Sequence, residues 1–153
     1  MLTYNFDYSI WKLDPFGYHI TNLVLHILVS LLLFFFVRKF TKDERVAFIA
    51  AALFVVHPLN IESVTYIAGR ADSLMAVFLL SSIILFDRHF QEKGIRMALV
   101  YSLSVFSFVL AALCKESAII FPIVIFLYAL FFKSQEEIEN SNRSIKFHYM
   151  SFF

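Results

Sequence analysis

The sequence is dominated by apolar runs long enough to cross a lipid bilayer. The first run extends from Tyr18 to Val37 and ends at the cations Arg38 and Lys39. A transmembrane helix needs about 20 mainly apolar residues, and this run supplies that number. The composition agrees, because 60% of the 153 residues are hydrophobic and 16% are charged, whereas a soluble domain has about 45–50% and about 25%. We therefore expect an integral membrane protein.

Four more apolar segments follow the first. They cover Val46 to Val56, about Ile61 to Phe86, Met97 to Leu113 and Ala118 to Phe132. The shortest stops at His57-Pro58, because proline removes a hydrogen-bond donor and pushes the preceding residue out of the helical region. It can span the bilayer only by borrowing residues 43–45 or by tilting. The sequence thus predicts an all-α fold, a polytopic transmembrane helical bundle of about five spans.

We assign the transmembrane bundle to residues 18–133. The segments before and after it are less uniformly apolar. Residues 1–17 carry tyrosines and a tryptophan that suit an amphipathic segment at the membrane interface, at the end of an exterior loop. Residues 134–153 form a polar cytoplasmic tail, and its last residues could lead into a truncated further span. The single cysteine, Cys114, excludes an intrachain disulfide. A net charge of +1 gives no reason to expect a nucleic acid partner.

The distribution of basic residues indicates which loops lie on which side of the membrane. Cytoplasmic loops carry an excess of Lys and Arg. With five spans, one side holds Arg38, Lys39, Lys42, Arg45, Arg88, Lys93, Arg96, Lys133, Arg143 and Lys146, and the other holds Lys12, Arg70 and Lys115. We expect the first side to be cytoplasmic and the second to face the exterior or the lumen.

The segment HPLNIESVTYIAGRAD, residues 57–72, places ionisable groups between apolar runs. On a helix capped by Asn60, Glu62 lies in the first turn, where the helix dipole favours a carboxylate. Tyr66 and Arg70 then follow on the same face. With a rise of about 1.5 Å per residue, Arg70 lies about 12 Å in from Glu62. A charge in the bilayer costs at least about 2.5–3.5 kcal/mol near its centre, so Arg70 is expected to meet a wet cavity or a charged ligand.

Each ionisable residue also has a purely structural interpretation. Arg70 and Asp72 are two positions apart and point to different sides of a helix, so each needs its own partner. A structural carboxylate would suit Arg70, and Lys115 would suit Asp72. Lys115 and Glu116 can equally mark a membrane boundary. His57-Pro58 can be a helix stop alone, and Glu62 a first-turn carboxylate alone.

A polar stripe runs along the first span. His19, Asn22 and His26 fall at positions i, i+3 and i+7, so they share one helix face. The simplest interpretation is that they form interhelical hydrogen bonds, worth about 0.6 kcal/mol each. Contact with a ligand is the alternative.

Cations beside carboxylates at a membrane surface suggest an anionic ligand that is itself anchored in the membrane. A polyprenyl phosphate sugar has this chemistry, and Arg70 or Lys115 would hold its phosphate through charge-assisted hydrogen bonds. Sugar transfer also needs a base for the acceptor and a clamp for the leaving phosphate. The candidate donor-binding residues are Arg70, Lys115, Glu62, Asp72, Glu116 and His57. The sequence assigns no metal ligand and leaves a divalent-metal requirement open.

Three ordered blocks carry a family resemblance. They are DPFGYHITNLVLHILVSLLLF, HPLNIESVTYIAGRADSLMAVFLLSS and CKESAIIFPIVIFLYAL, which lie within residues 4 to about 132. They resemble the membrane domain of the transmembrane and tetratricopeptide-repeat-containing O-mannosyltransferases and of their bacterial relatives in the GT-C superfamily. His57, Pro58, Glu62, Gly69, Arg70 and Asp72 match the family's HP-x-x-x-E and GRAD block, and Lys115-Glu116 match its KE block.

The resemblance implies a GT-C helical bundle and a lipid-linked sugar donor. The donor would be a dolichyl or polyprenyl phosphate sugar, often mannose, and the acceptor a protein hydroxyl on the luminal or periplasmic side. The membrane would be that of the endoplasmic reticulum in a eukaryote or the inner membrane in a bacterium.

The sequence also departs from the family pattern. GT-C enzymes carry a catalytic acid in the first exterior loop, and neither Asp7 nor Asp14 matches the expected position, so the acid is expected upstream of Met1. The tetratricopeptide repeats are not in this sequence either. We therefore expect a fragment of a larger glycosyltransferase. The alternatives are a noncatalytic membrane anchor or scaffold and, less favoured, a transporter fragment, because the fourth and fifth spans carry almost no charge in their interiors.

Overall fold

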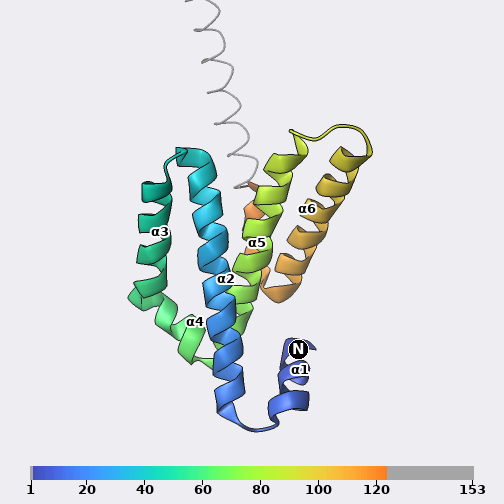
Figure 1. The fold of residues 1–153 in the computed structure, drawn as a ribbon. Helices are drawn as coiled ribbons and strands as arrows, with labels where there is room; N and C mark the ends of the chain where they lie inside the picture. Colours follow the sequence, from blue (N-terminus) through green and yellow to red (C-terminus); the bar gives the residue numbers. More distant parts are fainter. Residues whose placement is uncertain (1, 124–153) are drawn as a thin grey trace, which may run out of the picture. The chain divides into compact units, whose positions relative to one another are not determined.

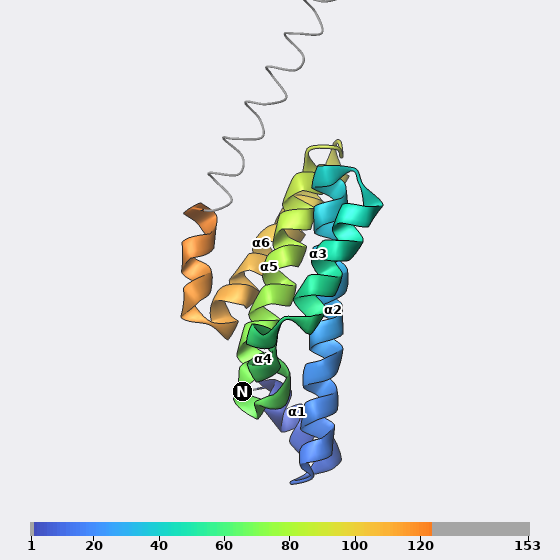
Figure 2. The same cartoon turned by 90° about the vertical axis from the view of Figure 1, so that its left-hand side faces the viewer.

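The fold is built from helices alone in the part of the chain that the structure, a computed structural model, describes, which is residues 2–123 (Figures 1 and 2). The elements are α1 (Leu2–Trp11), α2 (Pro15–Thr41), α3 (Glu44–Val56), η1 (Pro58–Asn60), α4 (Ile61–Thr65), η2 (Ile67–Gly69), α5 (Arg70–His89), α6 (Ile95–Cys114) and η3 (Glu116–Ile120), where η marks a 3-10 helix. The chain divides into a unit of Met1–Ala118 and a second unit of Ile119–Phe153. Most of the predicted span of 118–132, and all of the predicted tail of 134–153, lie outside the described residues.

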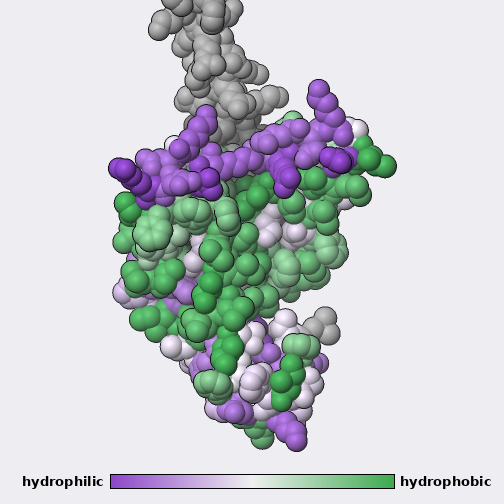
Figure 3. Space-filling view, viewed as in Figure 1, coloured by the Kyte–Doolittle hydropathy of each residue, from purple (hydrophilic) through white to green (hydrophobic). Residues whose placement is uncertain are grey.

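Three helices are long and apolar enough to span a membrane within residues 2–123. They are Pro15–Thr41, Ile67–His89 and Ile95–Cys114, and the bent pair of Glu44–Val56 with Pro58–Thr65 makes a fourth span if it counts as one. This confirms the all-α polytopic fold. In Figure 3 an apolar belt covers these helices below a strongly polar rim at one end.

The first span begins earlier than its hydropathy indicates. Asp14 caps α2, because its side chain accepts a hydrogen bond from the Phe16 backbone N–H at 3.0 Å. Pro15 occupies the first helical position, where its missing N–H leaves no donor unsatisfied. α2 therefore starts inside residues 1–17, which the sequence assigned to an exterior loop. That segment also holds a helix of its own, α1.

The second span is short and bent. Its helix includes residues 44 and 45 ahead of the apolar run, as the sequence predicted. Asp43 caps α3 by accepting from the Arg45 N–H at 2.8 Å, so the helix begins at Glu44. It ends at Val56, before His57, whose backbone is extended (φ −67°, ψ 127°). The predicted helix stop at His57-Pro58 is confirmed. The chain turns by 55° there into η1 and α4.

The prediction of one continuous helix from Ile61 to Phe86 is wrong. α4 ends at Thr65, and Tyr66 adopts an extended backbone (φ −90°, ψ 124°). η2 follows, and Arg70 opens the new helix α5. Glu62, Tyr66 and Arg70 therefore do not share a helix face, and a depth for Arg70 measured from Glu62 has no meaning.

Local packing explains this break. A Cβ atom on Gly69 would lie 2.7 Å from the Glu62 carbonyl oxygen and 2.8 Å from the Ser63 Cα, so only glycine lets η2 fold back so closely onto α4. The predicted Asn60 cap is also wrong. Its side chain makes no capping bond to α4 and instead donates to the Phe54 carbonyl at 2.5 Å.

Small and polar residues hold α5 against α6. Ser82 donates to the Ser104 carbonyl at 3.0 Å, and Ser104 donates to the Ser82 carbonyl at 2.8 Å. Both side chains are buried, as is Ala111 on α6. Small residues at such seams let helix backbones approach closely in a membrane.

Several of the basic residues predicted to share one side of the membrane lie at one end of this unit, whereas Lys133, Arg143 and Lys146 lie outside the described residues. Lys39 at the end of α2 pairs with Asp87 near the end of α5, and Arg38 pairs with Glu44 at 2.7 Å. These pairs join the end of α2 to the end of α5 and to the start of α3, and Figure 3 shows a polar rim at one end of the unit. That this rim is cytoplasmic stays a prediction.

Candidate functional site

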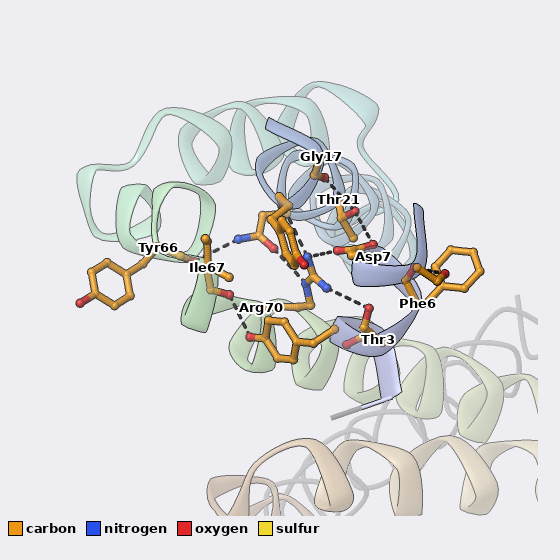
Figure 4. A network of polar contacts seen from close by, with 12 residues as sticks. Thr3, Phe6, Asp7, Gly17, Thr21, Tyr66, Ile67 and Arg70 are labelled. Atoms are coloured by element: carbon orange, nitrogen blue, oxygen red, sulfur yellow. Dashed lines mark hydrogen bonds and ion pairs between the residues drawn. The ribbon is translucent and has the colours of Figure 1, made fainter. Parts of the chain in front are cut away.

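Arg70 lies at the centre of a buried polar network (Figure 4). It is the first residue of α5, at the opposite end of that helix from the Lys39–Asp87 pair. Its side chain is completely buried and forms an ion pair with Asp7 of α1. Its Nε donates to the Asn22 side-chain oxygen at 3.1 Å. The two terminal nitrogens donate to the backbone carbonyls of Thr3 at 3.3 Å and Tyr18 at 3.4 Å. A cation that first appeared to need a ligand is thus surrounded by protein groups.

Two aromatic rings complete the enclosure. The guanidinium carbon lies 4.7 Å from the centre of the Tyr4 ring and 5.9 Å from that of Tyr18. Both distances are within the range of cation–π attraction. Arginine suits this position, because its planar group carries five donors and stacks on rings. Lysine offers three donors on a single nitrogen and would not reproduce these contacts.

Residues of the same network also donate hydrogen bonds to backbone carbonyls at the helix break. The bend between α4 and α5 frees backbone carbonyls, which need new hydrogen-bond partners wherever water is excluded. Asn22 donates to the Tyr66 carbonyl at 3.0 Å, and the Tyr4 hydroxyl donates to the Ile67 carbonyl at 2.9 Å. Asn22 therefore joins the break to Arg70. The predicted interhelical role of Asn22 is confirmed.

Close packing of α1 on α2 brings Asp7 to this position. A Cβ atom on Gly17 would lie only 2.1 Å from the Trp11 ring, so glycine is required where α1 meets α2. Thr21 donates to the Asp7 carboxylate at 3.2 Å. Asp7 is nearly as buried as Arg70. The sequence did not indicate this partner, although its DPFG motif contains Gly17, the glycine at the close approach of α1 to α2.

A shallow groove of about 660 Å³ opens beside the break. Its lining combines aromatic, hydroxyl and apolar side chains of Tyr4, His19, Thr65, Tyr66, Ile67 and Ala68. His19 is exposed there, unlike the other two members of the polar stripe. His26 is buried against the Val55 carbonyl at 3.3 Å and stacks on the Phe54 ring. Asn22 and His26 thus serve helix packing, and His19 faces a groove.

A second, exposed cluster joins the start of α5 to the end of α6. Lys115 pairs with Asp72, and each side chain keeps 44% of its surface exposed. Ser117 lies beside this pair and contacts the Met75 sulfur at 3.3 Å. The expectation that Arg70 and Asp72 have separate partners is confirmed. So is the pairing of Asp72 with Lys115.

The structure therefore divides the predicted donor-binding residues. Arg70 belongs to the buried network, and Lys115 with Asp72 forms the exposed pair. His57 uses its Nδ1 to accept from the Leu59 N–H at 3.2 Å. Glu62 and Glu116 are exposed. Within residues 2–123, no three His, Cys, Asp or Glu side chains converge to hold a metal ion.

Known proteins resemble this chain over most of its length. The family model described as dolichyl-phosphate-mannose-protein mannosyltransferase matches residues 8–152. Protein O-mannosyl-transferase TMTC3 of Mus musculus is 36% identical over 134 residues, which are 86% of this chain and 14% of that protein. TMTC1 of Homo sapiens is 31% identical over 153 residues, 95% of this chain and 17% of that protein. No solved structure matches. The chain thus spans only about a seventh to a sixth of the length of these relatives.

Proposed function

Because this chain belongs to the dolichyl-phosphate-mannose-protein mannosyltransferase family, we propose that it forms part of an integral membrane glycosyltransferase. The enzyme moves mannose from a dolichyl or polyprenyl phosphate carrier to a protein hydroxyl on the luminal side of the endoplasmic reticulum membrane. The family match over residues 8–152 carries this proposal. It agrees with membrane-spanning helices that have charged groups at their ends.

Lys115 holds the carrier phosphate in this proposal. It is the cation of the exposed pair, at the end of a membrane-spanning helix, where a lipid-linked phosphate would lie. Phosphate oxygens accept hydrogen bonds from an ammonium group as well as a carboxylate does, so the phosphate can replace Asp72 as the partner of Lys115. Asp72 keeps Lys115 in place before the donor arrives. The exposed Glu62, Glu116 and His57 contact the sugar or the acceptor.

Arg70 has a different role from the phosphate ligand that the sequence suggested. Its side chain is completely buried, and it pairs with Asp7 and donates to Asn22. We assign it as a positioning residue that fixes α1 and the start of α5. An exposed cation can reach an incoming phosphate, whereas a buried one would first have to lose Asp7.

Mannose transfer by the complete protein that carries this chain tests the proposal. Lys115→Gln should reduce transfer from dolichyl phosphate mannose by about 10²-fold or more, in line with the loss of one donor to a developing anion. Lys12→Gln is the matched control, because Lys12 is an exposed cation just before α2 and should leave transfer unchanged. Unchanged transfer in a folded Lys115→Gln protein would exclude this role. If the chain is instead a noncatalytic anchor, neither substitution should change mannose transfer.

A further inference from the structure

A second groove lies between α2 and α3 at the end of the unit that carries the polar rim. It has a volume of about 440 Å³ and is lined by Phe34, Glu44, Arg45, Phe48 and Ile49. Glu44 and Arg45 open α3, and we call their end of the groove its mouth; Phe48 and Ile49 follow about one turn further along α3, and with Phe34 we call them its walls. In Figure 3 the rim lies directly above apolar surface on α2 and α3.

The apolar walls run inward from the rim, along the helices. Phe34 lies seven residues before the end of α2, which is about 10 Å at 1.5 Å per residue. On α3, Phe48 is 67% exposed and Ile49 is 57% exposed. Since α2 is long and apolar enough to span a membrane, an acyl chain of a surrounding lipid would lie parallel to these walls.

Arg45 supplies a free positive charge at the mouth. The neighbouring acids are already engaged, because Glu44 pairs with Arg38 at 2.7 Å and the Asp43 carboxylate accepts from the Arg45 backbone N–H. Within residues 2–123, no acidic partner is found for the Arg45 guanidinium.

The rim as a whole has the same excess of positive charge. Residues 38–45 and 87–96 together contain seven basic and four acidic residues. The basic residues are Arg38, Lys39, Lys42, Arg45, Arg88, Lys93 and Arg96, and the acidic residues are Asp43, Glu44, Asp87 and Glu92. Basic groups at a membrane surface attract anionic lipids by about 1 kcal/mol each. The charge at this end is therefore complementary to an anionic headgroup.

We propose that the groove between α2 and α3 binds one anionic phospholipid. Its phosphate pairs with Arg45, and one acyl chain lies on Phe34, Phe48 and Ile49. A lipid fits better than a peptide, because the walls belong to helices of membrane-spanning character and only the mouth is polar. This site lies at the opposite end of the unit from the Lys115–Asp72 pair and does not rest on the proposed glycosyltransferase function.

Quenching of a tryptophan in the groove tests this proposal with the full chain in lipid nanodiscs. Trp11 is the sole tryptophan, so Trp11→Phe combined with Phe48→Trp gives a single reporter on the groove wall. Brominated phosphatidylserine and brominated phosphatidylcholine are compared at equal mole fraction. We expect phosphatidylserine to reach half-maximal quenching at about a fivefold lower mole fraction, as one headgroup–cation contact implies.

Variants at the rim separate a built site from diffuse attraction. Arg45→Gln should abolish the preference for phosphatidylserine, whereas Arg96→Gln, which removes a rim cation on α6, should retain it. Arg45→Lys keeps the charge and should retain most of it. Equal quenching by the two lipids, or equal losses in Arg45→Gln and Arg96→Gln, would overturn the proposal. So would the absence of quenching by either lipid, which would mean that another segment or a second copy covers the groove.

Discussion

The two ends of this helical unit hold arginines in opposite ways. Arg70 and its partner Asp7 have side chains that are 0% and 5% exposed, whereas Arg38 and Glu44 at the rim are 48% and 69% exposed. Arg70 also binds a side-chain amide and two backbone carbonyls. Arg38 has a single carboxylate. The difference shows which charged residues of a membrane chain shape its fold and which only border the membrane.

The physical reason is the loss of water around the charge. Removing one partner of a buried ion pair leaves an uncompensated charge and costs about 3–5 kcal/mol. An exposed pair contributes about 0–1 kcal/mol, because water solvates either partner alone. The Arg70 network should therefore control stability, and the rim pairs should affect it weakly.

Replacing Arg70 should have the largest effect. Arg70→Gln leaves Asp7 buried without its cation, so the free energy of unfolding should fall by about 3–5 kcal/mol. Thermal unfolding in detergent, followed by helical circular dichroism, measures this change. Arg38→Gln is the matched control with an expected change below about 1 kcal/mol. Equal effects of the two substitutions would break the comparison between the two ends.

Asn22 should come next, because it bonds both Arg70 and the freed carbonyl of Tyr66. Asn22→Ala leaves these groups unsatisfied at a buried position and should cost about 1–3 kcal/mol. The same unfolding measurement applies. His19→Ala on the same stripe changes only an exposed side chain and should be nearly neutral. A neutral Asn22→Ala would mean that water or lipid headgroups reach the break.

The serine pair between α5 and α6 should contribute less. Ser104→Ala removes one of two reciprocal bonds, and interhelical hydrogen bonds in membrane proteins average about 0.6 kcal/mol with a maximum of about 1.7. Ser102→Ala changes an exposed serine on the same helix and serves as the control. A loss above about 2 kcal/mol would show that this serine pair contributes more than interhelical hydrogen bonds in membrane proteins usually do.

The rim pair should show the smallest effect and the strongest salt dependence. A double-mutant cycle on Arg38 and Glu44 should give a coupling energy below about 1 kcal/mol. Raising the ionic strength to 1 M shortens the screening length to about 3 Å and should remove most of that coupling. A coupling that survives high salt would show that the rim is shielded from solvent.

The sequence predicted those features that depend on neighbouring residues. The length of the apolar runs predicted α2 and α6, and Pro58 predicted the end of α3. The two-residue spacing of Arg70 and Asp72 predicted that they have separate partners. The helix break at Tyr66 was not predicted, because the apolar pattern continues through this position. The Tyr66 carbonyl accepts its hydrogen bond from Asn22, which is 44 residues away in the sequence. Asp7 was missed for a similar reason. It was assessed as an unmatched acid of a loop, whereas its role comes from the packing of α1 on α2.

The most direct test of the central claim, that Arg70 joins α1 to the start of α5 through Asp7, is a double-mutant cycle on this pair. Unfolding free energies are compared for the unmodified chain, Asp7→Asn, Arg70→Gln and the double variant. We predict a coupling energy of about 3 kcal/mol or more, with the double variant no less stable than Arg70→Gln, because each single variant leaves one buried charge unpaired and the double variant leaves none. Effects that add to within about 0.5 kcal/mol would contradict the account, since independent residues behave in that way.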